Sequence, residues 1–281
     1  MKIGLFVVTP GRKGGGPETY ETGLLRGLAA VDTQNRYYVY CTTPAAVTAL
    51  NITNSNFTFR VLKPESRWLS IPFSLPTAML RDRLDVYHAT MVPAPVTITP
   101  LVMSILCSSN WDHPEFYDPT VLKRLNFLLA CGMRQSRYMM CISDYLIQYM
   151  HNRFKTNLNR LKLSYMGVGP EFWPRPVSDA RHFLREKYQI EGPYMVFIGQ
   201  QQERKNIFRV IEAFSQFKKE TGSDTKLVIV GREPDTSGPI YEALRTHGIL
   251  GSVQRIRYIP ISDLPELYSC AQMLVFPSLW E

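Results

Sequence analysis

The chain has 281 residues, of which 45% are hydrophobic and 12% aromatic, and its net charge is +8. At about 100–200 residues per domain this length predicts two domains, and the composition excludes a disordered chain. The excess charge lies in residues 1–170, which hold 18 basic and 10 acidic residues, whereas residues 171–281 hold 14 of each. The basic residues form no run and no groove-reading motif, which argues against nucleic acid. An anionic membrane surface, or simply a soluble basic surface, fits this charge better.

The cysteines and apolar segments indicate the compartment. No CxxC pair and no metal-ligand spacing occurs among Cys41, Cys107, Cys131, Cys141 and Cys270. Most of them lie in or near apolar segments, where a reduced thiol acts as a small hydrophobe. No signal peptide and no run of about 18 apolar residues is visible. We therefore expect a cytoplasmic protein that needs no metal or other cofactor, with peripheral contact at the inner face of the membrane as a further hypothesis.

The first 170 residues alternate apolar segments with helical patterns. Residues 2–8 form a strand that is apolar on both faces, as in a parallel sheet. A glycine loop follows, and Pro17 and Glu18 begin a helix that runs to about residue 31. Further strands are predicted at 36–41, 57–62, 85–88, 101–106, 137–142 and 161–165, with helices at 119–136 and after Ser143. This alternation predicts a doubly wound parallel sheet in residues 1–170.

The second part of the chain repeats the same architecture. Residues 171–193 are rich in proline and glycine, which predicts an interdomain linker with one short helix near 180–188. Residues 194–281 begin a second α/β domain, with strands at 194–198, 226–230, 253–258 and 272–276 and helices at 207–219, 239–247 and 262–269. The chain stops in the loop after the last strand, so we expect this second Rossmann-like domain to be incomplete.

The loop of residues 11–16 lies between the first strand and the first helix. Its glycines let backbone amides approach an anion at a helix N-terminus. Dinucleotide binding is disfavoured, because Thr19 replaces the third glycine of the motif and Cys41 and Thr42 end the second strand without an acid. A tight turn without any ligand is the other alternative.

A second loop places Arg204 and Lys205 at the start of a helix. The helix dipole disfavours cations there, which a bound diphosphate would explain, since Arg and Lys form charge-assisted hydrogen bonds to phosphate. A solvated surface pair is the alternative. The chain ends at Glu281, beyond the carboxyl end of the last strand, where open α/β sheets bind ligands.

These residues, in this order and spacing, resemble the retaining glycosyltransferases of family 4, also called glycosyl transferases group 1, over essentially the whole chain. The resemblance rests on residues 14–28, 141–145 with 166–173, 197–231 and 264–281. It implies a GT-B fold with an acceptor-side domain at 1–170, a linker at 171–193 and a partial nucleotide-sugar domain at 194–281.

The resemblance also implies roles for individual residues. Arg204 and Lys205 would hold the diphosphate of a nucleotide-sugar donor and stabilise it as it leaves. Glu281 would hydrogen-bond the donor sugar. His88 would line the acceptor side. The glycines Gly15, Gly16 and Gly199 would contribute to donor binding. The acceptor would be a glycan or a lipid-linked sugar in polysaccharide or glycolipid assembly, and residues 203–206 resemble those of relatives that use mannose-type donors.

The chain departs from the family pattern at three places. Leu106 and Cys107 stand where the family often has His-Asp, with Asp112 and His113 as candidate substitutes. Gln200 replaces an arginine, and the second glutamate of the family motif would lie beyond residue 281. A truncated or degenerate homologue that binds a nucleotide sugar or a partner without transfer is therefore the alternative function, and a sugar-nucleotide epimerase is a weaker one.

A membrane hypothesis concerns the helix at 119–136. Residues 121–129 mix Lys123 and Arg124 with large apolar side chains, as an interfacial helix does. Ordinary packing of this helix into the core is the alternative reading.

Overall fold

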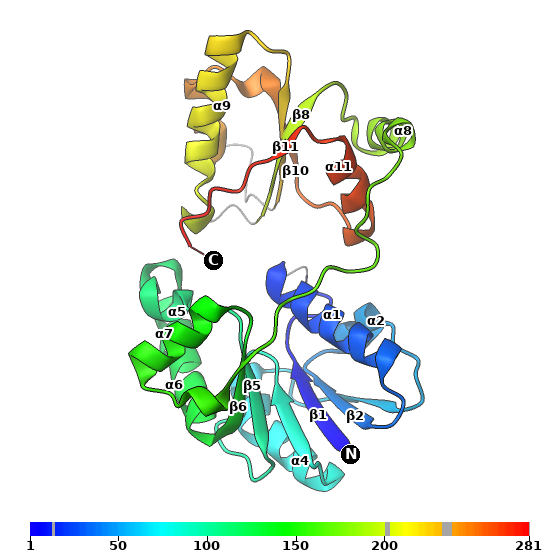
Figure 1. Cartoon of the computed structure of the whole chain (residues 1–281), viewed down its shortest axis with the longest axis vertical. Coiled ribbons are helices and arrows are strands. Elements are labelled where there is room, and N and C mark those ends of the chain that lie inside the picture. Colours follow the sequence, from blue (N-terminus) through cyan, green and yellow to red (C-terminus); the bar gives the residue numbers. More distant parts are fainter. Residues whose placement is uncertain (13–14, 200–202, 232–237, 281) are drawn as a thin grey trace. The chain divides into compact units, whose positions relative to one another are not determined.

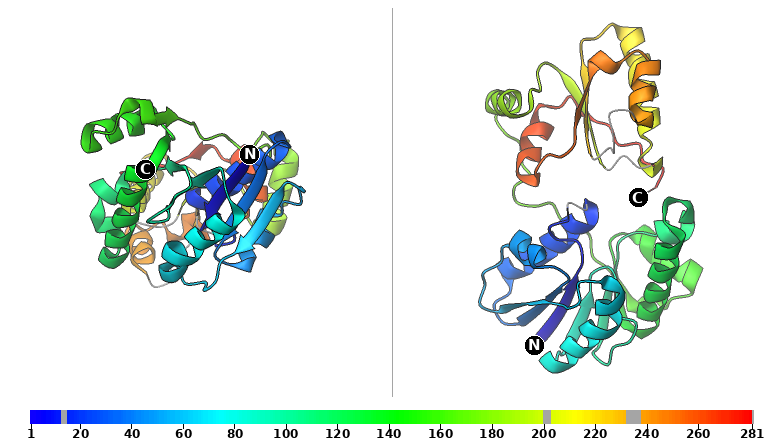
Figure 2. Two further views of the ribbon diagram at one scale, coloured as in Figure 1. Left: turned by 90° about the horizontal axis from the view of Figure 1, so that it is seen from below. Right: turned by 180° about the vertical axis from the view of Figure 1, so that it is seen from behind.

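Two α/β units make up the chain in a computed structural model, which describes residues 1–12, 15–199, 203–231 and 238–280 (Figure 1). The units are Met1–Gly167 and Val168–Glu281. Each has its own parallel sheet with helices on both faces, as the views from below and behind in Figure 2 also show. The predicted architecture of two doubly wound sheets is confirmed.

The first unit contains a seven-stranded sheet in the order β3-β2-β1-β4-β5-β6-β7, with every neighbouring pair parallel. The chain leaves β1 toward β2 and β3 and then crosses back to β4, so β1 and β4 flank the point where the strand order reverses. The strands are β1 (Lys2–Val7), β2 (Arg36–Cys41), β3 (Phe57–Val61), β4 (Val86–Ala89), β5 (Leu101–Ile105), β6 (Ser136–Cys141) and β7 (Leu161–Leu163).

Helices cover both faces of this sheet. On one face, Leu25 of α1 and Leu50 of α2 pack on Leu5 and Val39. The other face carries the larger core cluster, to which α4, α6 and α7 contribute. The helices are α1 (Gly16–Val31), α2 (Pro44–Leu50), α3 (Arg67–Leu69), α4 (Leu75–Asp82), α5 (Ser109–Asp112), α6 (Pro119–Gln135) and α7 (Asp144–Phe154), and the π-helical turn η1 (Ser70–Ser74) joins α3 to α4. Ser143 caps α7 as expected, because its hydroxyl accepts from the Leu146 amide.

The second unit contains a four-stranded sheet among the described residues, in the order β10-β9-β8-β11. The strands are β8 (Tyr194–Ile198), β9 (Lys226–Val230), β10 (Val253–Ile256) and β11 (Met273–Leu274). Helices α9 (Ile207–Thr221) and α10 (Pro239–Thr246) cover one face, and α8 (Val177–Tyr188) and α11 (Leu264–Cys270) cover the other (Figure 1). Helix α8 lies inside the segment expected as a linker, and its Leu184 packs in the core of this unit.

The main difference from the predicted elements lies between β3 and β4. No helix was expected at residues 67–82, where the structure has α3, η1 and α4 in direct succession. Proline lies at position 72, inside η1, and at position 76 in the first turn of α4. Proline removes an amide donor and interrupts regular helical hydrogen bonding, which explains why the pattern of this segment does not read as one helix.

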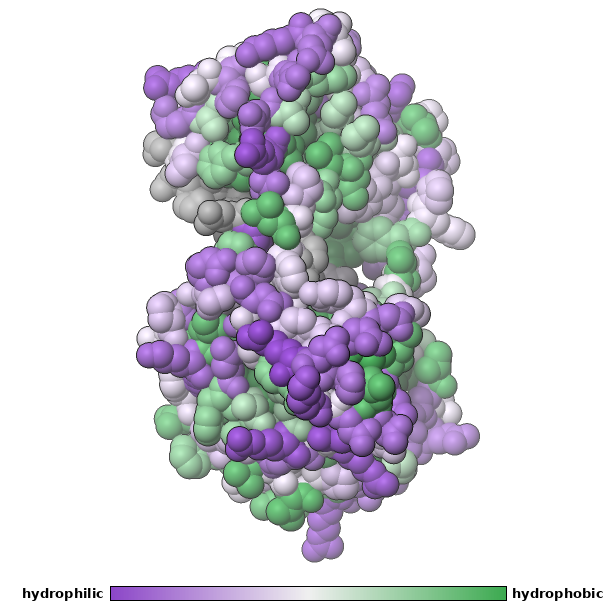
Figure 3. Space-filling view, turned by 60° about the vertical axis from the view of Figure 1, so that its left-hand side comes forward, coloured by the Kyte–Doolittle hydropathy of each residue, from purple (hydrophilic) through white to green (hydrophobic). Residues whose placement is uncertain are grey.

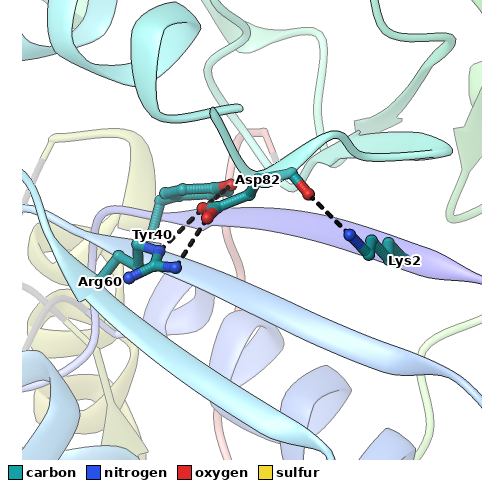
Figure 4. Close-up of polar contacts among 4 residues, drawn as sticks. All are labelled: Lys2, Tyr40, Arg60 and Asp82. Atoms are coloured by element: carbon teal, nitrogen blue, oxygen red, sulfur yellow. Dashed lines mark hydrogen bonds and ion pairs between the residues drawn. The ribbon is translucent and has the colours of Figure 1, made fainter. Parts of the chain in front are cut away.

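The end of α4 is tied to the sheet by a buried carboxylate (Figure 4). Asp82 is 6% exposed and accepts hydrogen bonds from Tyr40 Oη at 2.8 Å and from Nε and Nη2 of Arg60 at 2.8 and 2.7 Å. Lys2 Nζ donates to the backbone carbonyl of Asp82. Burial opposes ionisation, but the bonds from Arg60 and Tyr40 outweigh it, so the pKa of Asp82 lies below its ordinary value.

We expect Asp82→Ala to lower the free energy of unfolding by about 2 kcal/mol at neutral pH, because the Tyr40 hydroxyl and the Arg60 guanidinium lose a charged acceptor. A depressed folded-state pKa contributes stability above the unfolded value of 3.8 and loses it as the pH falls through the folded value. The difference in free energy of unfolding between wild type and variant, measured by urea titration, should therefore decrease below about pH 4. The control is Asp85→Ala, which removes an exposed acid bonded to the Lys2 amide and should cost about 0.5 kcal/mol. An equal loss in both variants would contradict the prediction.

Candidate functional site

The carboxyl ends of β1 and β4 form the first candidate region. In doubly wound sheets, ligands bind beyond the strands' carboxyl ends, where the strand order reverses. In the first unit this point lies between β1, which leads into Val8 and Thr9, and β4, which leads into Thr90.

Glu21 of α1 lies beneath this point and is fully buried. Its carboxylate accepts from the amides of Val8 and Thr9, at 3.0 and 2.8 Å, and lies 2.5 Å from the hydroxyl oxygens of both Thr9 and Thr90. Burial raises the pKa of Glu21, and the hydrogen bonds from Thr9, Thr90 and Val8 oppose that shift. Sequence analysis did not single out this residue.

The backbone of the β1–α1 loop is held by side chains on several sides. Glu18 accepts from the amide of Gly11 at 2.7 Å, and Arg67 of α3 donates to the carbonyl of Val8 at 2.9 Å. Together with Glu21, these contacts engage the amides of Val8, Thr9 and Gly11 with carboxylates of the chain itself. A phosphate at these three amides would therefore have to displace a carboxylate.

The two glycines assigned to donor binding lie at the N-terminus of α1. Gly15 is its N-cap residue with φ +76°, a backbone conformation that favours glycine, and Gly16 is the first helical residue. A Cβ built on either glycine would meet no atom within 4 Å, so the surface at both positions is open. Gly14 lies outside the described residues.

His88 belongs to a chain of polar side chains that crosses three elements. Its Nε2 lies 2.8 Å from Ser104 Oγ in β5, and Ser104 Oγ lies 2.6 Å from the hydroxyl of Tyr20 in α1. Burial lowers the pKa of His88 to about 4, so its imidazole is neutral near pH 7. A neutral imidazole can accept or donate a hydrogen bond but carries no charge.

The residues considered as substitutes for the missing His-Asp pair make local contacts. Asp112 accepts a hydrogen bond from Tyr149 at 2.6 Å, and His113 Nδ1 lies 2.9 Å from Glu115 at the surface. Cys107 lies 3.3 Å from Ser109 Oγ. His113 and one carboxylate oxygen of Asp112 thus have partners within the chain, whereas Asp112 Oδ2 is buried without a hydrogen-bond partner among the described residues.

The second candidate region lies at the corresponding reversal in the second unit, between β8 and β11. The loop after β8 and the segment after β11 are joined by hydrogen bonds. The amide of Leu279 donates to the carbonyl of Arg204 at 2.8 Å, Arg204 Nη1 donates to the carbonyl of Trp280 at 3.4 Å, and Asn206 Nδ2 donates to the carbonyl of Pro277 at 3.1 Å.

Lys205 is enclosed by the same two segments. It is 8% exposed, and its Nζ lies 4.4 Å from the ring centroid of Phe276, within range of a cation–π contact. Gly199 follows β8, and a Cβ built there would approach Lys205 and Phe276 at about 4 Å. The structure thus brings Gly199, Arg204 and Lys205 together with the end of β11. Glu281 and Gln200 lie outside the described residues.

Two further findings concern metals and membranes. Among the described residues, no group of three His, Cys, Asp or Glu side chains could hold a metal ion. Within the same residues, no helix combines the length and the apolar character needed to cross a membrane.

Comparison with known proteins agrees with this geometry. Residues 180–281 match the family described as "Glycosyl transferases group 1". The chain is 23% identical to O-antigen chain mannosyltransferase B of Escherichia coli over 204 residues, which is 72% of this chain and 53% of that protein. The chain therefore spans about half the length of this curated relative.

Solved structures resemble the chain along nearly all of its length. Sucrose-phosphate synthase from Thermosynechococcus elongatus superposes with a TM-score of 0.74 at 16% identity, covering 100% of this chain and 76% of that one. HepE of Anabaena, in complex with UDP-glucose, gives a TM-score of 0.75 at 15% identity and covers 99% and 74%. The chain thus has a GT-B fold, and its residues 180–281 match the glycosyl transferases of group 1.

Proposed function

We propose that the protein is a retaining glycosyltransferase that moves a sugar from a nucleotide-sugar donor to a glycan or lipid-linked acceptor in polysaccharide or glycolipid biosynthesis. One observation carries the proposal. Arg204 and Lys205 lie beside the segment after β11, at the strand-order reversal of the unit that matches the glycosyltransferase family.

The chemistry follows from where charge develops. Breaking the bond between the donor sugar and its diphosphate leaves negative charge on the diphosphate, and fixed cations stabilise that charge most strongly where little water is present. Lys205 is buried, and the Arg204 backbone is fixed by the Leu279 amide. We assign both cations to the diphosphate, Gly15, Gly16 and Gly199 to donor binding, and Glu281 to the donor sugar, with no metal taking part.

The acceptor side is assigned to the first unit. His88 is neutral and held by Ser104 at the carboxyl edge of β4 and β5, where a hydroxyl group of an incoming sugar could bind it. The name of the mannosyltransferase relative supports a mannose-type donor such as GDP-mannose, whereas the UDP-glucose complex of HepE supports a UDP-sugar. A reaction in the cytoplasm is consistent with these donors.

We expect Arg204→Met and Lys205→Met each to lower kcat about 100-fold or more in the full-length protein, because each removes one charge that stabilises the departing diphosphate. The assay follows transfer from a panel of GDP- and UDP-sugars to octyl α-mannoside. Arg209→Met is the matched control, since Arg209 lies in the first turn of α9, just after the 3-10 turn that contains Arg204 and Lys205, and pairs with Glu212 at the exposed surface. Full activity in both site variants, or an equal loss in the control, would refute the assignment.

A protein that binds the nucleotide sugar without transferring it is the second candidate function. Leu106 and Cys107 replace the frequent His-Asp pair, and His113 pairs with Glu115 at the surface, which favours this alternative. The two functions are separated by measuring donor binding calorimetrically beside turnover. Binding that depends on Lys205 without any transfer would establish the second function.

The proposal also includes peripheral contact of the protein with a membrane surface. The segment of α3 and η1 exposes Trp68 by 56% and Phe73 by 67%, and the Arg124 guanidinium lies 4.3 Å from the Trp68 ring centroid. In the view of Figure 3, hydrophobic side chains reach the surface between hydrophilic ones. Helix α6 buries Leu128 and Leu129 in the core but exposes Phe127. Large apolar side chains beside cations are typical of surfaces that bind an anionic membrane interface.

We expect the protein to co-sediment with vesicles of phosphatidylcholine and phosphatidylglycerol at low salt, and less with phosphatidylcholine alone. The double variant Trp68→Ser, Phe73→Ser should lower the partition coefficient about tenfold, because two apolar side chains no longer enter the interface. Phe208→Ser on α9 is the control, since Phe208 is exposed on the unit without excess charge. Absence of binding by the wild type, or an equal loss in the control, would remove the membrane proposal.

A further inference from the structure

The buried carboxylate of Glu21 has no part in the transfer chemistry described above, yet it lies at the strand-order reversal of the first unit. Four donors surround it: the amides of Val8 and Thr9 and the hydroxyls of Thr9 and Thr90. Val8 and Thr9 follow β1, whereas Thr90 follows β4. A single side chain of α1 therefore connects the two segments that leave the sheet at its reversal.

The neighbouring residue of the same helix makes the adjoining contact. Tyr20 binds Ser104, which binds His88, and His88 lies two residues before Thr90. Consecutive residues of α1 thus hold two polar groups of one edge: Tyr20 reaches His88 through Ser104, and Glu21 reaches Thr90. The position of the imidazole at the end of β4 depends on both contacts.

The hydrogen bonds of the Thr90 hydroxyl indicate which substitutions of Glu21 keep this arrangement. Thr90 Oγ1 lies 2.5 Å from Glu21 Oε1 and 2.7 Å from the carbonyl oxygen of Phe6. The hydroxyl has one proton, so it can donate to only one of these oxygens at a time. A glutamine at position 21 can donate its amide proton to Thr90, which then donates to Phe6, while the amide oxygen accepts from Val8 and Thr9. Glutamine therefore preserves the contacts to Thr9 and Thr90 and the shorter of the two contacts from the Val8 amide, whereas an apolar side chain of similar length preserves none.

We propose that Glu21 is a positioning residue for the acceptor: by tying the segments after β1 and β4 together, it fixes the edge at which His88 meets the acceptor sugar. The inference rests on the proposed glycosyltransferase function. It assigns to Glu21 no contact with substrate and no proton transfer. Its effect should fall on the acceptor more than on the donor, because Arg204, Lys205 and Gly199 belong to the other unit and only Gly15 and Gly16 of the proposed donor site lie at the start of the helix of Glu21.

The test compares steady-state kinetics of Glu21→Met and Glu21→Gln in the full-length protein, with octyl α-mannoside as acceptor and the nucleotide sugar on which the wild type turns over. Glu21→Met should raise the acceptor KM about tenfold or more and change the donor KM much less, because small displacements of positioning groups cost one to two orders of magnitude. Glu21→Gln should restore near wild-type values.

Asp32 provides a matched control at the other end of the same helix. Its carboxylate also accepts four hydrogen bonds, from the amides of Gln34 and Asn35, the Asn35 side chain and the Tyr37 hydroxyl. Asp32→Leu should therefore lower the Tm without changing the acceptor KM. If Glu21→Met fails to fold, Thr90→Val breaks the contact on the β4 side alone and should raise the acceptor KM, whereas Thr90→Ser should not.

The outcomes separate this inference from the function on which it rests. A wild type that transfers no sugar from any donor of the panel refutes the proposed function, and the inference with it. A wild type that transfers, beside Glu21→Met and Thr90→Val variants with an unchanged acceptor KM, refutes the inference alone. The inference is also overturned if the donor KM of Glu21→Met rises as much as its acceptor KM, or if Asp32→Leu raises the acceptor KM as much as Glu21→Met.

Discussion

The contact between Glu21 and the segments after β1 and β4 is the constraint on which the first candidate region depends. A doubly wound sheet sends the chain to opposite sides of β1, so the segments at the reversal diverge and expose backbone groups there. A buried carboxylate is costly unless several donors surround it, and here two amides and two hydroxyls do so. Burial still dominates, since the pKa of Glu21 stays above its ordinary value. Stability alone does not require such a group, because an apolar side chain could fill the same space.

In the second unit, hydrogen bonds to backbone carbonyls connect the two segments that diverge at the strand-order reversal. The loop after β8 and the segment after β11 are joined by the Leu279 amide on the Arg204 carbonyl and by the Asn206 side chain on the Pro277 carbonyl. These bonds place the two cationic residues Arg204 and Lys205 beside the segment after β11. The second unit thus presents two cationic side chains at its strand-order reversal, whereas the corresponding region of the first unit contains the buried carboxyl group of Glu21. This difference supports assigning the diphosphate to the second unit.

Sequence patterns predicted the strands well, because a buried parallel strand is a short apolar run with little freedom in its bounds. Strands β2, β8 and β9 have the expected ends, and each of the others differs by no more than two residues at either end. Helices α3 and α4 were missed because prolines at 72 and 76 disrupt their periodicity. Glu21 was not predicted as a site residue, because a charged residue of an amphipathic helix is normally expected to face solvent. One signal was present: Glu21 precedes Leu25 by four residues and Leu28 by seven, which places it on the apolar face of α1. Its partners at Val8 and Thr90 could not be inferred without the strand order.

The polar chain from Tyr20 through Ser104 to His88 changes how the loss of the His-Asp pair is understood. That pair would follow β5, where Leu106 and Cys107 stand. Ser104 lies in β5 itself, two residues earlier, and its hydroxyl contacts the imidazole of the neighbouring strand. In the proposed function, strand β5 therefore contributes to the acceptor edge through the Ser104 hydroxyl beside His88 instead of through an imidazole of its own. Because burial keeps His88 neutral, this edge offers hydrogen bonds without charge, which suits the hydroxyl groups of a sugar better than a phosphate. The roles proposed for the two units thus follow from electrostatics: neutral donors and acceptors where a sugar would bind, and cations where a diphosphate would leave.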